Sequence, residues 1–395
     1  MNTDPVVILS YARTPIGSFQ GSLAGASATE LGAAAVKGAV DRARVDGSDI
    51  DRIYMGCVLP AGLGQAPARQ AAIKAGLPIS VEATTVNKMC GSGMQAAIMG
   101  AEALAAGSVD LLVAGGMESM TNAPYLLAKH RAGARIGHDR IIDSMFLDGL
   151  EDAYEPGKAM GVFAEETAQE YQFTRGAQDD YAVTSLTRAQ AAQRSGGFDR
   201  EIVAVEVKGR KGVTIVDQDE QPLKGDIAKI PTLKAAFAKE GTITAANASS
   251  ISDGAAALVM TRESVATAKG LTPIARVVAS AAHAHEPSKF TTAPVDAINK
   301  VLDRAGWSVG DVDLFEVNEA FACVSMIAMR DLGIDHAKVN VNGGATALGH
   351  PIGASGARIV ATLIAALQNR GLKKGVASLC IGGGEATAMA IELID

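Results

Sequence analysis

The sequence predicts an α/β protein made of two related halves, whose mostly parallel sheets have helices around and between them. Three observations carry this prediction. Strand-like apolar segments alternate with alanine-rich helical segments, residues 41–53 are repeated at 303–315, and a polar middle segment interrupts the first copy. The chain has 395 residues, 48% of them hydrophobic, so it can bury a large core and form more than one domain.

The first copy contains each element of a strand–helix–strand–helix–strand unit. VVILS at residues 6–10 predicts the first strand, and an amphipathic pattern near residues 29–44 predicts the first helix. RIYMG at 52–56 predicts the second strand, a helix follows Cys90, and LLVAGG at 111–116 predicts the third strand.

The second copy follows at a nearly constant offset. DRARVDGSDIDRI at 41–53 matches DRAGWSVGDVDLF at 303–315, and Ser92-Gly93 matches Ser355-Gly356, each opening an alanine-rich helix. DLLVAGGMES at 110–119 matches VASLCIGGGEA at 376–386. Three matches in the same order indicate an internal duplication. We expect residues 1–120 and 251–272 to form one half, 273–395 the other, and 121–250 an inserted region that covers a ligand.

Composition narrows the class of protein. The net charge is −7, and the basic residues are scattered, which argues against binding to nucleic acid. No apolar run reaches the ~18 residues of a membrane span, and MNTDPVVILS has no basic region of a secretory signal. Four cysteines without CxxC spacing favour a reducing compartment. We therefore predict a cytoplasmic protein that contacts neither membrane nor nucleic acid.

Two stretches raise the question of a metal or a reactive cysteine. His283-Ala284-His285 could bind a metal, but a flexible polar loop beside Pro287 is the favoured interpretation, and no metal site is predicted. In VNKMCGSGMQ, residues 86–95, a strand end and a tight turn precede a buried helix. Cys90 lies where that helix begins, so free N–H groups and the helix dipole would stabilise a thiolate. A packed, inert cysteine is the alternative.

The duplication predicts that two further reactive side chains, His350 and Cys380, lie near Cys90. His350 in GGATALGHPIGASG lies two residues from the position equivalent to Cys90, and Cys380 precedes Gly382-Gly383-Gly384. Equivalent turns of doubly wound sheets lie at the carboxyl ends of strands, so these three side chains are expected to converge. His350 suits a general base. Cys57 and Cys323 have only the packed interpretation. For Asn318 and Glu319 after the strand DLFEV, a catalytic and a local hydrogen-bonding role both stay open.

Together, VNKMCGSGMQ, NEAFA, GGATALGHPIGASG and CIGGG resemble the thiolases, in order and spacing over essentially the whole chain. GGMESM and NASSISDGAAA also look like segments of that family. The resemblance implies a duplicated, layered α-β-α-β-α fold with two mixed sheets and a covering loop domain. Of the two alternatives for Cys90, packed or reactive, the resemblance favours a reactive, nucleophilic cysteine.

The resemblance also implies the role of each site residue. Cys90 would accept an acyl group from an acyl-CoA, with His350 as its activator. Cys380 would move the proton at Cα of the second acetyl-CoA. Asn318 would hold a water that forms one oxyanion hole with His350, and the N–H groups of Cys90 and Gly382 would form the other. Two oxyanion sites suit Claisen chemistry, because negative charge develops on two thioester oxygens at different steps. Neither a metal nor a redox cofactor is expected.

The coenzyme A contacts implied by the resemblance are Ser249, Ala245, Phe237, Leu150, Met160 and Phe321. Core packing explains the apolar ones equally well. Lys211 and Lys224 could meet the phosphates of coenzyme A, or they could belong to a solvated face.

Two positions depart from the short-chain biosynthetic thiolases. Ala159 precedes Met160 where a histidine is common, and Phe290 stands where a methionine is common. The expected reaction joins two acetyl-CoA into acetoacetyl-CoA and CoA, and a broader 3-ketoacyl-CoA range is the alternative. A decarboxylating ketoacyl synthase and a non-catalytic acyl-CoA-binding protein are more distant rivals. The expected partners are acetyl-CoA, acetoacetyl-CoA and CoA, and the expected assembly is a homodimer or homotetramer.

Overall fold

The main sheet has ten strands, and its hydrogen-bonded path runs β12-β13-β14-β11-β1-β10-β5-β3-β4, with the short β2 paired to β10. The computed structural model describes residues 4–209 and 212–394. The strands of this sheet are β1 (Val6–Arg13), β2 (Gly17–Ser18), β3 (Arg52–Gly56), β4 (Glu82–Val86), β5 (Leu111–Ser119), β10 (Ser252–Arg262), β11 (Ala275–Ala284), β12 (Leu314–Val317), β13 (Lys374–Ile381) and β14 (Glu385–Leu393).

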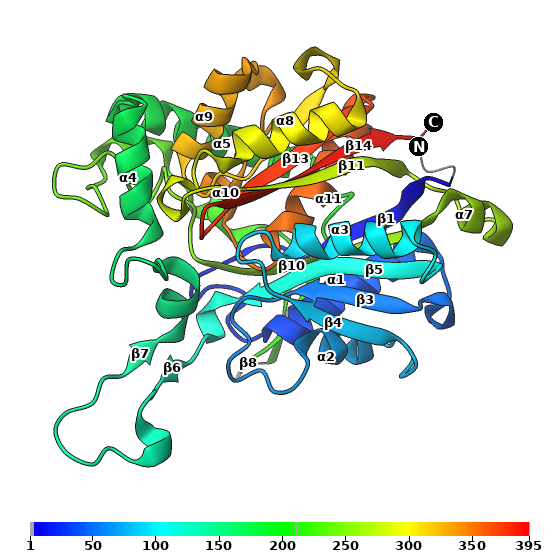
Figure 1. Ribbon diagram of the computed structural model, residues 1–395, viewed down its shortest axis with the longest axis horizontal. Helices are drawn as coiled ribbons and strands as arrows, with labels where there is room; N and C mark the ends of the chain where they lie inside the picture. Colours follow the sequence, from blue (N-terminus) through cyan, green and yellow to red (C-terminus); the bar gives the residue numbers. More distant parts are fainter. Residues whose placement is uncertain (1–3, 210–211, 395) are drawn as a thin grey trace.

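The path bends around two central helices, so its halves lie in separate layers (Figure 1). α3 (Ser92–Ala105) and α11 (Ser355–Arg370) lie between the layers, and their buried side chains join one core with both sheets. α1 (Ala28–Ala43) and α2 (Pro67–Lys74) cover the outer face of the first sheet, and α8 (Ala293–Ala305) and α9 (Ala322–Leu332) cover that of the second. The predicted α/β class and the α-β-α-β-α order of layers are confirmed.

The two sheets meet at β1 and β11 through only two residue pairs, Val7 with Arg276 and Ile8 with Ala275. The predicted pair of sheets is therefore one continuous path with a narrow link. Among the named strands of the described residues, the parallel pairs are β3 with β4, β3 with β5, and β12 with β13. The central strands run antiparallel, because β10 returns along β5 and a tight turn joins β13 directly to β14. The expectation of mostly parallel pairing thus holds only for the outer strands.

The duplication appears in equivalent elements of the two halves. α3 begins at Ser92 and α11 at Ser355, as the sequence match predicts. Short 3₁₀ turns at Gly47–Asp49 and Val309–Asp311 precede β3 and β12 in the same way. The strands and helices predicted for the first copy are all present.

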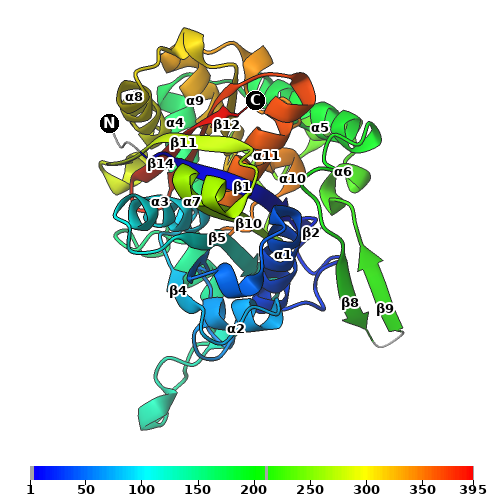
Figure 2. The ribbon, with the colours of Figure 1, turned by 90° about the vertical axis from the view of Figure 1, so that its right-hand side faces the viewer.

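The inserted segment forms helices and two hairpins that project from the layers (Figures 1 and 2). Its elements are β6 (Tyr125–Leu126), β7 (Ile142–Asp143), a π-helix (Phe146–Leu150), α4 (Met160–Glu170), α5 (Arg175–Arg194), β8 (Val205–Gly209), β9 (Gly212–Val216) and α6 (Glu220–Lys224). The remaining α-helices of the described residues are α7 (Glu263–Lys269) and α10 (Ala345–Leu348). In the part of the chain that the structure describes, each helix is too short or too polar to cross a bilayer.

A buried ion cluster ties the inserted segment to the first half. Arg13 of β1 donates to both carboxylate oxygens of Asp219, at 2.7 and 2.8 Å, and to Glu201 at 3.0 Å. All three side chains are fully buried. Each carboxylate contacts the guanidinium, so each buried ion has a partner of opposite charge, although the cluster carries one negative charge in excess.

Candidate active site

A mostly apolar cavity of ≈ 390 Å³ lies between the two halves and the inserted segment. Nine of the eleven site residues predicted from the sequence line it: Cys90, His350, Gly382, Ser249, Ala245, Phe237, Leu150, Met160 and Phe321. The other two, Cys380 and Asn318, are buried and do not line this cavity. The structure therefore brings together residues that are up to 292 positions apart in the chain, from Cys90 to Gly382.

Cys90 lies in a tight turn between β4 and α3. Met89 just before it has a left-handed backbone, with a φ of 47°. The Ser92 hydroxyl closes the turn, because it accepts from the Lys88 N–H at 2.9 Å and donates to the Met89 carbonyl at 2.6 Å. Gly91 allows the turn to pack on β13, since a Cβ there would lie 2.4 Å from Ile381 Cδ1. This local geometry presents Cys90 to the cavity.

The surroundings of Cys90 disfavour its thiolate in the resting protein. Burial raises the pKa of the Cys90 thiol to about 11, and the Glu118 carboxylate acts in the same direction. The backbone N–H groups of Gly382 and of Cys90 itself lower that pKa. These two N–H groups therefore face the sulfur and can stabilise negative charge there. Cys90 is the one cysteine among the described residues that is not fully buried.

His350 is buried and keeps one ring nitrogen free for chemistry. Its Nδ1 lies 2.6 Å from the Ser355 hydroxyl, which itself donates to the Pro351 carbonyl at 2.9 Å. The hydroxyl has only one hydrogen, so Nδ1 must be the donor in the first contact. Nε2 then holds a lone pair, and it has no hydrogen-bond partner within residues 4–209 and 212–394. Burial lowers the pKa of His350 to about 3, and the Arg358 guanidinium acts in the same direction. The side chain is a neutral base.

Cys380 lies near the end of β13, just before the turn at Gly382–Gly384. Gly383 and Gly384 have φ values of 92° and 85°, which glycine adopts without strain. Burial raises the pKa of Cys380 well above its ordinary value, and negative charge on Cys90 and on Cys323 acts in the same direction. Ile381, the next residue of β13, packs against Gly91 in the turn that carries Cys90.

Asn318 follows β12, and its amide is oriented by a buried arginine. Its backbone N–H donates to the Ser378 carbonyl at 2.9 Å, and its Oδ1 accepts from Arg358 Nη2 at 3.3 Å. Arg358 also lies 3.6 Å from the buried Glu316 carboxylate. With Oδ1 engaged, the Asn318 Nδ2 group is the available donor, and it has no partner among the described residues.

Glu319 has a structural position rather than a place on the cavity. One of its oxygens accepts from the Tyr181 hydroxyl at 2.9 Å and from Asn340 Nδ2 at 2.8 Å. The other accepts from the Ser185 hydroxyl at 2.8 Å and from Thr346. Of the two roles left open for Glu319, hydrogen bonding is the one the structure supports, although its partners lie on distant elements.

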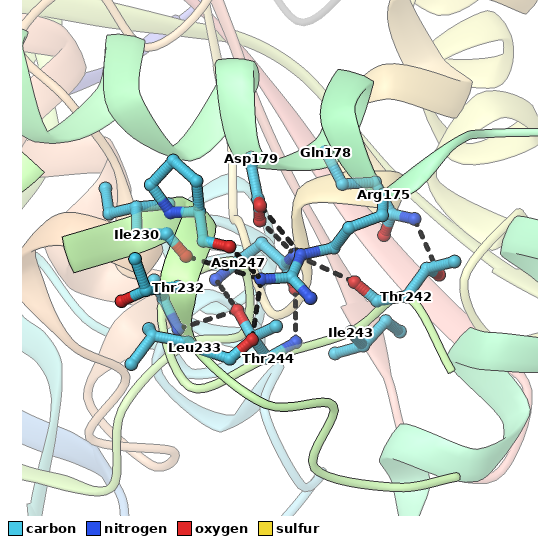
Figure 3. A network of polar contacts seen from close by, with 12 residues as sticks. Arg175, Gln178, Asp179, Ile230, Thr232, Leu233, Thr242, Ile243, Thr244 and Asn247 are labelled. Carbon is cyan, nitrogen blue, oxygen red and sulfur yellow. Dashed lines mark hydrogen bonds and ion pairs between the residues drawn. The ribbon is translucent and has the colours of Figure 1, made fainter. Parts of the chain in front are cut away.

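A polar network holds the inserted segment over the cavity (Figure 3). Arg175 of α5 donates to Asp179 at 2.7 Å and to the Leu233 carbonyl at 2.8 Å. Asn247 donates to Asp179 at 2.9 Å and accepts from the Thr244 N–H at 2.8 Å. These bonds fix the chain from about residue 230 to residue 247, which carries Phe237 and Ala245, two of the predicted residues that line the cavity.

Of the two histidines near Pro287, His283 lies in a strand, so the loop interpretation is wrong for it, whereas His285 follows the end of β11. His283 belongs to β11, because its backbone pairs with Ala386 of β14. The ring nitrogens of His283 and His285 and a carboxylate oxygen of Asp296, which are the atoms that could bind a metal, lie within 4.8 Å of one another. Lys300 donates to His283 Nδ1 at 2.9 Å, so Nε2 of that ring carries the hydrogen that faces Asp296 at 3.2 Å.

The other sequence predictions have mixed outcomes. Cys57 and Cys323 are buried, as predicted. Lys224 pairs with Glu220 of the same helix, and Lys211 lies outside the described residues. Sequence reasoning missed Glu118 as an individual residue, although its segment GGMESM was noted. Burial raises the pKa of Glu118 to about 7, although hydrogen bonds from the backbone N–H groups of Val58, Leu59 and Gly353 lower it.

The arrangement is suited to transfer of an acyl group through a thioester. Cys90 and the neutral His350 imidazole line an apolar cavity, and two backbone N–H groups face the Cys90 sulfur. The second thiol, Cys380, is buried on β13 and does not line the cavity. Such a site can form an acyl-cysteine and stabilise the oxyanion that precedes it.

Comparison with known proteins identifies the family. The model of the thiolase N-terminal domain matches residues 6–264, and that of the thiolase C-terminal domain matches residues 271–393. An acetyl-CoA acetyltransferase of Rhizobium meliloti (strain 1021) is 48% identical over 393 residues, covering 99% of this chain and 100% of that protein. One of Escherichia coli (strain K12) is 50% identical over 391 residues, covering 98% and 99%. A crystal structure of the Bacillus anthracis acetyl-CoA acetyltransferase superposes with a TM-score of 0.96 at 40% identity, covering 99% of each chain. The chain belongs to the thiolase family.

Proposed function

We propose that the protein is an acetyl-CoA acetyltransferase, which interconverts two acetyl-CoA with acetoacetyl-CoA and CoA. The observation that carries this proposal is the meeting of Cys90, His350 and Gly382 in one cavity. Cys380 is buried one residue before Ile381, which packs against Gly91 of the Cys90 turn. The names of the relatives, acetyl-CoA acetyltransferase at 48% and 50% identity, support the same reaction.

In the acylation step, the Cys90 sulfur attacks the thioester carbonyl of acetyl-CoA while His350 Nε2 takes the thiol proton. The N–H groups of Cys90 and Gly382 hold the oxyanion. As the carbon–sulfur bond breaks, Cys380 gives its proton to the departing CoA sulfur. The products of this step are acetyl-Cys90, free CoA as its thiol, a His350 imidazolium and a Cys380 thiolate, so atoms, protons and charge balance.

In the condensation step, the Cys380 thiolate removes a proton from Cα of a second acetyl-CoA. The strong upward shift of the Cys380 pKa supports this role, because it makes the thiolate a strong base. The enolate oxygen is held by His350 and by a water on Asn318, and the enolate carbon attacks acetyl-Cys90. Acetoacetyl-CoA forms, and the Cys90 thiolate recovers its proton from the His350 imidazolium.

A broader 3-ketoacyl-CoA range is the second candidate, and it rests on two lining residues. Ala159 and Phe290, the two positions that depart from short-chain thiolases, both line the cavity. They therefore can contact the acyl group. Relative kcat/KM values for acetoacetyl-CoA and for 3-ketohexanoyl-CoA would separate the two ranges.

Intact-protein mass spectrometry after brief exposure to acetyl-CoA tests the proposal. Wild type and Cys380→Ala should gain an acetyl group, and Cys90→Ala should not. Cys380→Ala should also fail to make acetoacetyl-CoA. If no protein gains a group while CoA still binds, the chain is a non-catalytic acyl-CoA-binding scaffold. Product from malonyl-CoA but not from acetyl-CoA would instead favour a decarboxylating ketoacyl synthase. The cytoplasmic location, the lack of a metal or redox cofactor and the homodimer or homotetramer assembly stay predictions from the sequence.

A further inference from the structure

A buried carboxylate, Glu118, takes no part in the chemistry above yet contacts the loops around the site. It is the second-to-last residue of β5, and its side chain is fully buried. One of its oxygens, Oε2, accepts from the N–H groups of Val58 and Gly353, each at 2.9 Å. The other, Oε1, accepts from the Leu59 N–H at 3.1 Å and lies 3.7 Å from Cys57 Sγ. Glu118 therefore joins the chain after β3 to the chain between His350 and α11.

The peptide of Gly353 lies in a slot formed by three glycines of the first half, Gly56, Gly93 and Gly116. A Cβ on Gly116 would lie 2.0 Å from the Gly353 carbonyl oxygen, and one on Gly56 would lie 2.6 Å from it. A Cβ on Gly93 would lie 3.1 Å from the same oxygen. Side chains at the first two positions would displace the peptide, so the glycines permit this approach between the halves.

Residue 353 itself also has to be a glycine. A Cβ on Gly353 would lie 2.6 Å from Glu118 Oε2 and 3.0 Å from the Met117 carbonyl oxygen. The glycine slot thus holds the carbonyl side of Gly353, and Glu118 holds the N–H just before it. Both contacts act on one short segment, which leaves it little freedom relative to the first half.

This segment is next to both catalytic residues. His350 precedes Gly353 by three residues, and Cys90 precedes Gly93, a member of the glycine slot, by three residues. We propose that Glu118 is a positioning residue, which together with the glycine slot fixes the His350 loop of one half against the Cys90 loop of the other. The catalytic consequence of this proposal rests on the proposed function. The contact between Glu118 and the two loops does not depend on that function.

The chemistry of a carboxylate is required here because every polar neighbour is a donor. A glutamine could keep its oxygen at the Oε2 position, but its NH₂ group would then face the Leu59 N–H, donor against donor. An alanine would leave three buried N–H groups without acceptors, and each such group is strongly disfavoured. An aspartate keeps the charge but falls short by one methylene. The series Gln, Asp, Ala should therefore loosen the segment to increasing degrees.

Hydrogen exchange of the whole protein tests the contact without reference to catalysis. The amides of Val58, Leu59 and Gly353 should be protected in wild type. In E118Q, the peptide that carries Leu59 should exchange at least tenfold faster, and in E118D the peptide that carries Gly353 should do so as well. D313N is the matched control, because Asp313 also accepts two backbone N–H groups, at 3.0 and 2.8 Å, but does not line the cavity. It should leave the exchange of both peptides unchanged.

The catalytic consequence is measured on the same proteins. A misplacement of about 1 Å at a reacting group lowers rates by about 10²-fold. We expect E118D to acetylate Cys90 about 10²-fold more slowly than wild type, with KM for acetyl-CoA within threefold, and D313N to match wild type. If E118D does not fold, E118Q carries the test with a smaller expected loss of about tenfold.

The outcomes separate this proposal from the proposed function. Wild type that forms no acetyl adduct refutes the function, and exchange then still decides whether the contact exists. Unchanged exchange in both variants overturns the contact. Faster exchange with normal acetylation shows that Glu118 does not position His350, and equal slowing in D313N shows a general loss of stability; either result overturns the proposal.

Discussion

The rate at which Cys90 is alkylated should increase with pH well beyond the range of an ordinary thiol. With a pKa of about 11, the thiolate fraction at pH 7 is about 10⁻⁴, against about 10⁻² for a thiol with a pKa of 9. The difference of two pKa units corresponds to roughly 3 kcal/mol. No imidazolium offsets it in the resting protein, because His350 has a pKa of about 3 and is neutral. The rate should rise about tenfold per pH unit from pH 6 to pH 9.

The assay uses iodoacetamide at a fixed concentration and intact-protein mass spectrometry at each pH. Cys90→Ala is the control, and it should gain no adduct on the same timescale, because Cys57, Cys323 and Cys380 are buried. A wild-type rate that is constant between pH 6 and pH 8 would refute the reasoning. It would show that Cys90 and His350 form a thiolate–imidazolium pair before substrate binds.

Three further predictions concern stability and binding. From pH 8 to pH 4, the free energy of unfolding of wild type should fall by about 3 kcal/mol more than that of His350→Asn. The reason is that His350, whose pKa in the folded protein is depressed, binds a proton when the protein unfolds. Equal falls for the two proteins in urea denaturation would contradict this. Arg13→Met should destabilise the protein by about 3–5 kcal/mol, since Asp219 and Glu201 would keep buried charges without a partner; a denaturation midpoint close to that of wild type would rule it out. Asn247→Ala should raise KM for acetyl-CoA roughly tenfold with little change in kcat, because it loosens the segment over the cavity; steady-state kinetics would show the opposite pattern if the network served the chemistry instead.

The features that the sequence predicted well are those with a local signal. The position of Cys90 followed from an apolar strand, two glycines and an alanine-rich helix within about twenty residues. The start of α11 followed from its match to α3. The duplication then supplied long-range information, because it placed His350 two residues from the position equivalent to Cys90.

The features that the sequence did not predict depend on contacts between distant residues. Glu118 bonds to Gly353 across 235 positions, and neither residue has a local pattern that indicates this contact. The error at His283 has a related cause. Pro287 and nearby polar residues indicate a loop, whereas pairing with β14 extends β11 as far as Ala284. The two sheets form one continuous path because β1 lies between β10 and β11. The hydrophobic periodicity of the sequence does not show which strands are neighbours.

The central position of β1 has a consequence for synthesis on the ribosome. Val6 pairs with Arg262, which lies 256 residues later, and Val7 pairs with Arg276. At about 5–20 residues per second, an apolar strand that emerges first therefore waits roughly 10–50 s for either neighbour. During this interval its unpaired edges are open to other nascent chains. Chaperones that shield an early apolar segment should thus improve the yield of this protein, and chains that terminate before β10 should aggregate rather than fold as a half.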